Sequence, residues 1–195
     1  MQEIILASSS PRRKEILEDL GIPHLIVASS INEEMVLSDN LKINYDLSNL
    51  AMKLSFLKAE CVAKSFPNRL VLGADTFVAI QNQILGKPEN LHQAYEYLRL
   101  LSGKVHQVIT GFSIININRG YCLSDYDLTN VYVKDLLEND IKDYCKNENV
   151  LDAAGAYKIQ SFLTKYVDKI EGFYHTVMGL PVSKVYRAIS YFYKT

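Results

Sequence analysis

The sequence predicts an α/β protein in which helices surround a mixed β-sheet. Short apolar segments alternate with amphipathic segments along the chain, which is typical of this class. Two long runs rich in Val, Ile, Tyr and Thr, 105–117 and 121–134, flank Asn118-Arg119-Gly120 and predict an antiparallel hairpin. A long hairpin beside βα units indicates both parallel and antiparallel strand pairs in one sheet.

The remaining elements follow from hydrophobic periodicity and helix-end signals. Strands are expected at 3–7, 24–28, 71–72, 77–80 and 84–85, helices at 11–20, 48–64, 91–101, 136–146 and 182–193, and strand and loop over 153–177. Gly21 and Gly103 suit the left-handed residue that ends a helix. Asn90 and Gln93 resemble a capping box before the third helix.

The helix at 48–64 carries an apolar stripe formed by Leu50, Leu54, Leu57 and Cys61. Lys58 is expected at the edge of this stripe, about 80° from Leu50. An edge lysine can reach into a neighbouring cleft or point to water.

Composition favours one globular domain over residues 1–195. The hydrophobic fraction of 48% is enough for a substantial core. With 21 basic and 22 acidic residues, the net charge of −1 gives no signal for binding nucleic acid or an acidic membrane. Function therefore has to be sought in local clusters.

Other patterns point to a cytoplasmic protein. The three cysteines are widely spaced and lack metal-site spacing. No run of about 18 apolar residues predicts a membrane span, and the N-terminus does not resemble a signal peptide. Walker A, GxGxxG and Ser-His-Asp arrangements are missing from the sequence.

Residues 5–13, Ile-Leu-Ala-Ser-Ser-Ser-Pro-Arg-Arg, predict an anion site. A strand leads through a serine-rich turn into a helix, with Ser10 as N-cap and Pro11 as first residue. Helix N–H groups beside Arg12 and Arg13 would suit a triphosphate. The alternative is an ordinary capped surface helix whose Arg-Arg-Lys run is solvated.

Carboxylates form a second set of candidates. Asp75-Thr76 is expected directly after a buried strand, where ligands of α/β sheets gather, so Asp75 could hold Mg²⁺ or orient a water. A turn satisfying local backbone N–H groups is the alternative. Glu33 and Glu34 could supply another carboxylate, or simply be solvated.

Two further segments could contact a ligand. Gly86-Lys87-Pro88 forms a rigid turn whose lysine could meet a phosphate or point to water. In residues 154–160, Ala-Gly-Ala-Tyr-Lys-Ile-Gln, the glycine permits close backbone approach before an expected strand. Gln160 could read a base edge or bind a phosphate oxygen, whereas tight packing is the structural alternative.

Taken together, these segments resemble the Maf family of nucleoside triphosphate pyrophosphatases. The resemblance covers nearly the whole chain, with the pieces in the family's order: SSSPRRKEIL at 8–17, INEE at 31–34, Lys58-Ala59, LGADT at 72–76, LGKP at 85–88, LSGKVHQVITG at 101–111, AGAYKIQ at 154–160 and VMGLP at 177–181.

The resemblance implies a fold similar to that of inosine triphosphate pyrophosphatases, with a curved mixed sheet and two lobes around a deep cleft. It implies hydrolysis of a nucleoside triphosphate to the monophosphate and pyrophosphate with Mg²⁺ or Mn²⁺, and it is compatible with a homodimer. Glu33 and Asp75 would be the metal and water-positioning carboxylates, with Asp75 the general base. The substrate would be bound by Ser8, Arg12, Arg13, Lys58, Thr76, Lys87 and Gln160.

The subclass resembles the branch that acts on dTTP and UTP, a house-cleaning activity. Lys158 and Ser161 depart from this branch, in which glycines are usual, and could stiffen the loop and affect base selection. Two alternatives stay open: a nucleotide-binding regulator of cell division and septum formation, and the same reaction on 7-methyl-GTP or ITP.

Overall fold

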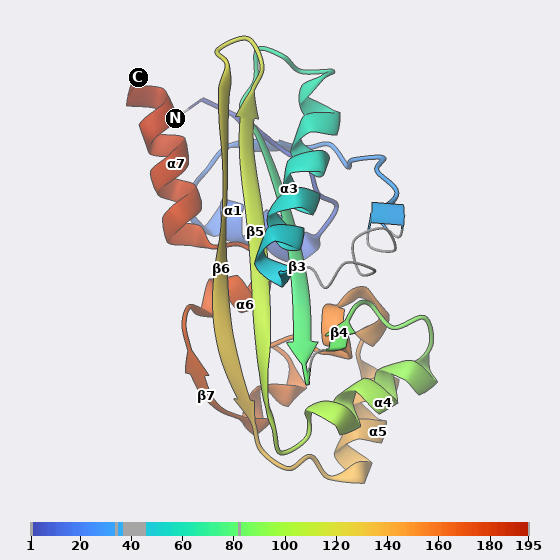
Figure 1. Cartoon of the computed structure of the whole chain (residues 1–195). Coiled ribbons are helices and arrows are strands. Elements are labelled where there is room, and N and C mark those ends of the chain that lie inside the picture. Colours follow the sequence, from blue (N-terminus) through green and yellow to red (C-terminus); the bar gives the residue numbers. More distant parts are fainter. Residues whose placement is uncertain (1, 34, 37–45, 82, 195) are drawn as a thin grey trace. The chain divides into compact units, whose positions relative to one another are not determined.

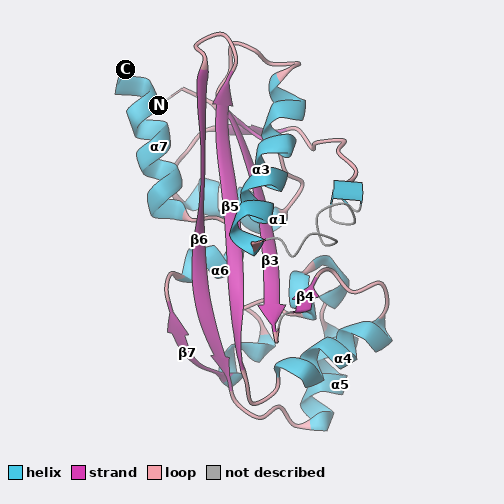
Figure 2. Ribbon diagram, viewed as in Figure 1, coloured by secondary structure: helices cyan, strands magenta, loops and turns pink. Residues whose placement is uncertain are grey.

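A computed structural model describes residues 2–33, 35–36, 46–81 and 83–194 (Figure 1). It confirms the α/β class, with helices and strands alternating along the chain (Figure 2). The strands are β1 (Ile4–Leu6), β2 (His24–Ile26), β3 (Val71–Ile80), β4 (Gln83–Leu85), β5 (Val105–Asn116), β6 (Tyr121–Val133) and β7 (Val167–Glu171). The α-helices are α1 (Pro11–Asp19), α3 (Leu47–Ala63), α4 (Leu91–Leu101), α5 (Glu138–Asn147), α6 (Tyr174–Met178) and α7 (Val182–Lys194), with short 3₁₀ segments at Val150–Asp152, Ala154–Ala156 and Phe162–Tyr166.

The strands form one mixed sheet in the order β2-β1-β3-β5-β6-β7, and β4 pairs with β3 outside this path. β1 runs parallel to both β2 and β3. The pairs β3–β4 and β6–β7 are antiparallel, and Figure 1 shows β5 and β6 running in opposite directions, as the predicted hairpin requires. The prediction of a mixed sheet is therefore confirmed.

The chain forms two compact units. The first contains residues 1–75, 110–127 and 179–195, and the second contains residues 76–109 and 128–178. The strands β3, β5 and β6 each contribute residues to both units. We describe each unit separately.

In the first unit, α3 packs unusually closely on the sheet. A Cβ atom added to Gly73 of β3 would lie 2.3 Å from the Ser55 carbonyl oxygen, and one added to Gly111 of β5 would lie 2.4 Å from the Ala51 carbonyl carbon. Small residues on both surfaces therefore let the backbones approach. Ala59 packs in the same layer with Ile5 and Val71.

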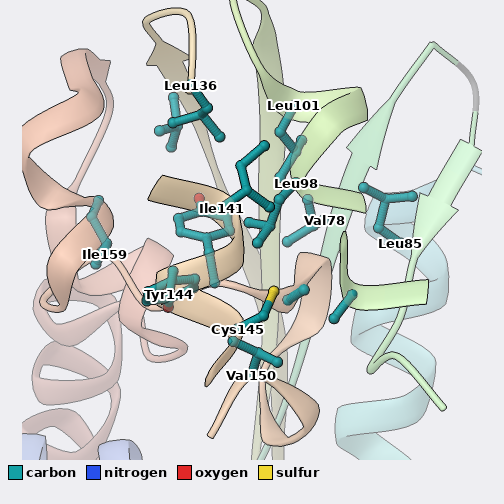
Figure 3. Packing of buried hydrophobic residues seen from close by; sticks show 14 of the residues in the cluster. Val78, Leu85, Leu98, Leu101, Leu136, Ile141, Tyr144, Cys145, Val150 and Ile159 are labelled. Carbon is teal, nitrogen blue, oxygen red and sulfur yellow. The ribbon is translucent and has the colours of Figure 1, made fainter. Parts of the chain in front are cut away.

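In the second unit, helices α4 and α5 lie side by side and enclose a buried hydrophobic cluster (Figures 1 and 3). Leu98 of α4 and Ile141 and Tyr144 of α5 are at most 1% exposed. Ile159 belongs to the same cluster, which ties the segment after the Ala154–Ala156 turn to this core. Burial of such side chains supplies the main favourable term in folding.

Several predicted helix ends are confirmed. Gly21 and Gly103 have φ of +62° and +67° just beyond α1 and α4, as left-handed helix-ending residues should. Asn90 Oδ1 accepts the Gln93 N–H at 2.9 Å, but Gln93 Oε1 accepts the N–H of Glu89, one residue earlier than a capping box requires. In the described part of the chain, every helix is too short or too polar to cross a membrane.

Two strand predictions were wrong, both because of glycine. Gly73 was interpreted as the end of a short strand, yet β3 continues through it to Ile80, since this glycine serves close packing against α3. Conversely, no strand follows directly after Gly155: it has φ of +68° and Ala156 has +61°, so residues 154–156 form a 3₁₀ turn, and β7 begins only at Val167. The helix α6 was also missed within 153–177.

Replacing Gly73 with alanine should destabilise the protein by about 3 kcal/mol, because the new methyl group would meet backbone atoms of α3. Gly86→Ala is the matched control, since a Cβ atom there meets nothing within 4 Å, and it should change stability by less than about 0.5 kcal/mol. Urea unfolding measures both. Equal stabilities for the two variants would refute the close packing.

Acidification should destabilise the second unit through His106. This side chain is 1% exposed, its Nε2 lies 2.7 Å from the Tyr157 hydroxyl, and burial lowers its pKa to about 4. The histidine of the unfolded chain titrates near pH ~6.5, so the unfolded state binds the proton more tightly and about 2 kcal/mol of stability is lost between pH ~7 and ~5. Urea unfolding should show a shallower pH dependence for His106→Gln and an unchanged one for exposed His92→Gln. Parallel curves for the wild type and His106→Gln would contradict this assignment.

Candidate functional site

Lys58 is the centre of the charged cluster in the first unit. The Lys58 side chain is 8% exposed, and its ammonium group donates a hydrogen bond to Asp75 Oδ1. It also lies 2.9 Å from Glu33 Oε1, whose side chain is half exposed. One cation from α3 thus joins two carboxylates from separate segments.

The packing of α3 explains why Lys58 is buried. The sequence placed it at the edge of an apolar stripe through Leu57 and Cys61, but the buried face is instead formed by Leu50, Ala51, Leu54, Ser55, Lys58, Ala59 and Val62. Leu57 and Cys61 are only partly buried. The small residues of α3 that meet Gly73 and Gly111 determine which face turns to the sheet, and Lys58 lies on it.

Asp75 lies within β3, and not directly after a strand as predicted. β1 pairs with β3 only as far as Leu6–Leu72, and Ala7 N–H bonds the Leu72 carbonyl, so Asp75 lies beyond the carboxyl end of the neighbouring parallel strand. With respect to β1, Asp75 therefore lies at the carboxyl edge of the parallel strands, as expected. Asp75 is 7% exposed, and this burial raises its pKa while Lys58 and Arg13 oppose the rise.

Arg13 brings a second buried cation toward Asp75. It is 8% exposed in the first turn of α1, where Nη1 donates to Ser8 Oγ at 2.8 Å and Nε donates to the Gly179 carbonyl at 2.8 Å. Burial lowers the pKa of this guanidinium and Asp75 opposes the change, but an arginine keeps its charge in proteins. Ser8 and Arg13 thus form a rigid pair.

The start of α1 matches the prediction in part. Ser10 is the N-cap and Pro11 the first helical residue, but the Ser10 side chain makes no capping bond within the described structure. Arg12 is half-buried, in contrast to Arg13. The serine hydroxyl therefore does not cap the helix as predicted, while the N-terminal end of α1 keeps the partial positive charge that favours an anion. Glu34 lies outside the described residues.

The carbonyl oxygen of Gly179 holds the Arg13 side chain. The two residues are 166 positions apart. Because the contact uses a backbone carbonyl, no side-chain pattern signals it, although the φ of +108° at Gly179 explains the glycine itself.

The second unit contains the remaining candidates. Thr76 is partly buried in β3, while Lys87 and Gln160 are exposed. The Gly155 N–H donates to the Gly86 carbonyl at 3.0 Å, so the turn before Gln160 is bonded to the turn that carries Lys87. A Cβ atom on Gly155 would lie 3.0 Å from Val78, which explains the glycine.

Glu33 and Asp75 are the pair that could hold a metal. Among described residues, no group of three or more His, Cys, Asp or Glu side chains is arranged to bind one. Mg²⁺, however, is commonly held by one or two carboxylates together with substrate phosphates. Two carboxylates that already share the Lys58 ammonium group fit that requirement.

The profile of the Maf-like protein family matches residues 3–192. The chain belongs to this family. The match includes every residue of the charged cluster, so the cluster lies within the part of the chain that defines the Maf-like family.

Curated Maf-like relatives match this chain along nearly its whole length. A dTTP/UTP pyrophosphatase of Alkaliphilus oremlandii is 43% identical, covering 95% of this chain and 93% of the relative. Proteins with the same name from Clostridioides difficile and Lachnoclostridium phytofermentans are 42% and 41% identical, covering 97% and 98% of this chain and 98% and 96% of the relatives.

Removing the ammonium group of Lys58 should raise the pKa of Asp75 further. In Lys58→Met, burial of Asp75 persists while the nearest favourable charge is lost. Carbon-13 NMR of labelled aspartate carboxyls can follow the titration. Lys64→Met, directly after the end of α3, is the control, because Lys64 pairs with Glu60 at the surface. An Asp75 titration unchanged by Lys58→Met would show that the pair does not govern this carboxylate.

Proposed function

We propose that this Maf-like protein is a nucleoside triphosphate pyrophosphatase that converts dTTP and UTP to the monophosphate and pyrophosphate. The buried cluster of Lys58, Asp75 and Arg13 carries the proposal, because it places cations and a base of raised pKa together. The names and near full-length similarity of its relatives support the substrate class. Residues 1–195 would act as one catalytic domain on free nucleotides in the cytoplasm.

Phosphate binding is assigned to the start of α1 and to α3. Ser8 holds the Arg13 guanidinium, a planar cation whose charge and shape suit a phosphate group. Arg12 adds a second guanidinium at the helix N-terminus, and Lys58 adds a point charge. These cations oppose the negative charge of the triphosphate, and they stabilise the additional charge that gathers on a departing pyrophosphate. In the second unit, exposed Lys87 would bind phosphate in the same way.

Glu33 and Asp75 would hold a divalent cation, Mg²⁺ or Mn²⁺. Both carboxylates contact the Lys58 ammonium group, and half-exposed Glu33 is accessible to a hydrated ion. Such an ion, when bound, neutralises phosphate charge and lowers the pKa of bound water.

Asp75 would act as the general base. A carboxylate whose pKa is raised by burial is a stronger base than an ordinary aspartate, while Lys58 and Arg13 keep it ionised. It accepts a proton from water as the water oxygen bonds to the α-phosphorus. The bond between the α-phosphorus and the α–β bridging oxygen breaks, and pyrophosphate leaves with the bonding electrons.

Base recognition is assigned to Gln160 and Thr76. The Gln160 amide offers a donor and an acceptor, which suits the adjacent N–H and carbonyl of uracil and thymine. The Thr76 hydroxyl would complete the substrate contacts. Both residues belong to the second unit.

Asp75→Asn should reduce turnover about a thousandfold, since the amide cannot accept the proton, while nucleotide binding persists. Pyrophosphate release measures turnover, and circular dichroism checks the fold. Asp19→Asn, at the exposed end of α1, is the matched control and should keep wild-type turnover. Wild-type rates in Asp75→Asn would remove this residue from the mechanism.

A substrate panel tests the function itself. Pyrophosphate release from dTTP, UTP, CTP, ITP and 7-methyl-GTP is measured with and without Mg²⁺. Metal-dependent release concentrated on dTTP and UTP is expected. Release mainly from a purine would keep the reaction and overturn the substrate assignment. Nucleotide binding without any release would instead support a regulator of cell division.

A further inference from the structure

The loop that carries Gln160 is closed by a ring of three hydrogen bonds. The Lys158 N–H lies 3.1 Å from the Tyr144 hydroxyl oxygen, which lies 2.9 Å from Ser161 Oγ, which lies 2.8 Å from the Lys158 carbonyl oxygen. The Lys158 N–H can only donate, and the Lys158 carbonyl can only accept. The Tyr144 hydroxyl therefore donates to Ser161, and the Ser161 hydroxyl donates to Lys158.

This ring is anchored in the core of the second unit. Tyr144 is 1% exposed on α5, within the hydrophobic cluster that also contains Ile159 (Figure 3). The Lys158 side chain is held 3.2 Å from Asp152 Oδ1. Gln160, exposed between buried Ile159 and the ring member Ser161, is thus held on both sides.

A second set of bonds fixes the backbone after Gln160. Thr164 Oγ1 lies 2.5 Å from the carbonyl oxygens of Ile159 and Ser161, and its single O–H can donate to either of them. The Thr164 N–H also bonds the Ser161 carbonyl at 2.9 Å. The peptide carbonyls on either side of Gln160 therefore have fixed partners.

Ser161 is the member that closes the ring. A glycine at this position would have no hydroxyl to join Tyr144 to the Lys158 carbonyl. Glycine at both 158 and 161 would also give the loop more conformational freedom. This chain thus has a braced form of the Gln160 loop.

We propose that Tyr144 is a positioning residue that acts through Ser161 and Lys158 to hold Gln160, and thereby sets selectivity for uracil and thymine nucleotides over CTP. The proposal rests on the proposed function. A side chain that hydrogen-bonds the base, such as Gln160, rejects a wrong base only if it stays in place and leaves the polar edge of that base unpaired. On a mobile loop, the same side chain can shift and pair with the wrong base.

The test compares kcat/KM for dTTP with kcat/KM for CTP in Tyr144→Phe and Ser161→Ala. Each change removes a hydroxyl from the ring, and each should lower the dTTP/CTP ratio by about five- to tenfold. Tyr132→Phe is the matched control, because its hydroxyl bonds Glu171 on the neighbouring strand of the same unit and should leave the ratio unchanged.

A double-mutant cycle shows whether the effect passes through Gln160. Gln160→Ala should itself lower the ratio, and Tyr144→Phe should add nothing in that background. Additive effects would overturn the positioning role. A dTTP/CTP ratio within twofold of wild type in both ring variants, with Gln160→Ala still lowering it, would also overturn it.

Hydrogen exchange tests, independently of activity, whether the ring of hydrogen bonds restrains the Gln160 loop. Amides of residues 157–161 should exchange faster in Tyr144→Phe and Ser161→Ala than in Tyr132→Phe. Unchanged exchange in both ring variants would overturn the brace even if catalysis is normal. If the wild type releases no pyrophosphate from any nucleotide, the proposed function fails, and the selectivity role falls with it.

Discussion

The buried ammonium group of Lys58 is the constraint on which the candidate site depends. It can meet Asp75 only because α3 lies on the sheet at backbone distance, which in turn requires glycine at 73 and 111. A side chain at either glycine would displace the helix and, with it, the lysine. Packing and charge placement are therefore one property of this unit, since the same small residues that let α3 approach also turn Lys58 inward.

Burying this many charges costs folding stability, so their burial calls for a functional reason. Removing ionised groups from water is unfavourable, and a buried ion pair is seldom a net source of stability. Here burial raises the pKa of Asp75 while Lys58 and Arg13 limit the rise, so one carboxylate is both basic and ionised. Arg13 is itself held by a serine hydroxyl and a carbonyl, so the cluster is arranged before a substrate arrives.

The sequence was informative where one local signal has one structural meaning. The long hairpin beside βα units predicted the mixed sheet, and Gly21 marked the end of α1 correctly. The strand end predicted at Gly73 was wrong, because a glycine is expected both in a turn and under a close-packed helix. Only the contact with Ser55 distinguishes the two. Whether Lys58 is buried or points to water stayed open in the sequence, because the face that α3 turns to the sheet depends on its contacts with Gly73 and Gly111. Residue types identified the members of the cluster, but the link from Arg13 to a distant carbonyl carries no sequence signal.

Hydrolysis of UTP in water enriched in oxygen-18 tests the central claim most directly. In the proposed mechanism, the water that Asp75 deprotonates attacks the α-phosphorus. Mass spectrometry of a single turnover should therefore find the label in UMP and none in pyrophosphate. Label in pyrophosphate would mean attack at the β-phosphorus and would contradict the proposed role of the Lys58–Asp75 cluster.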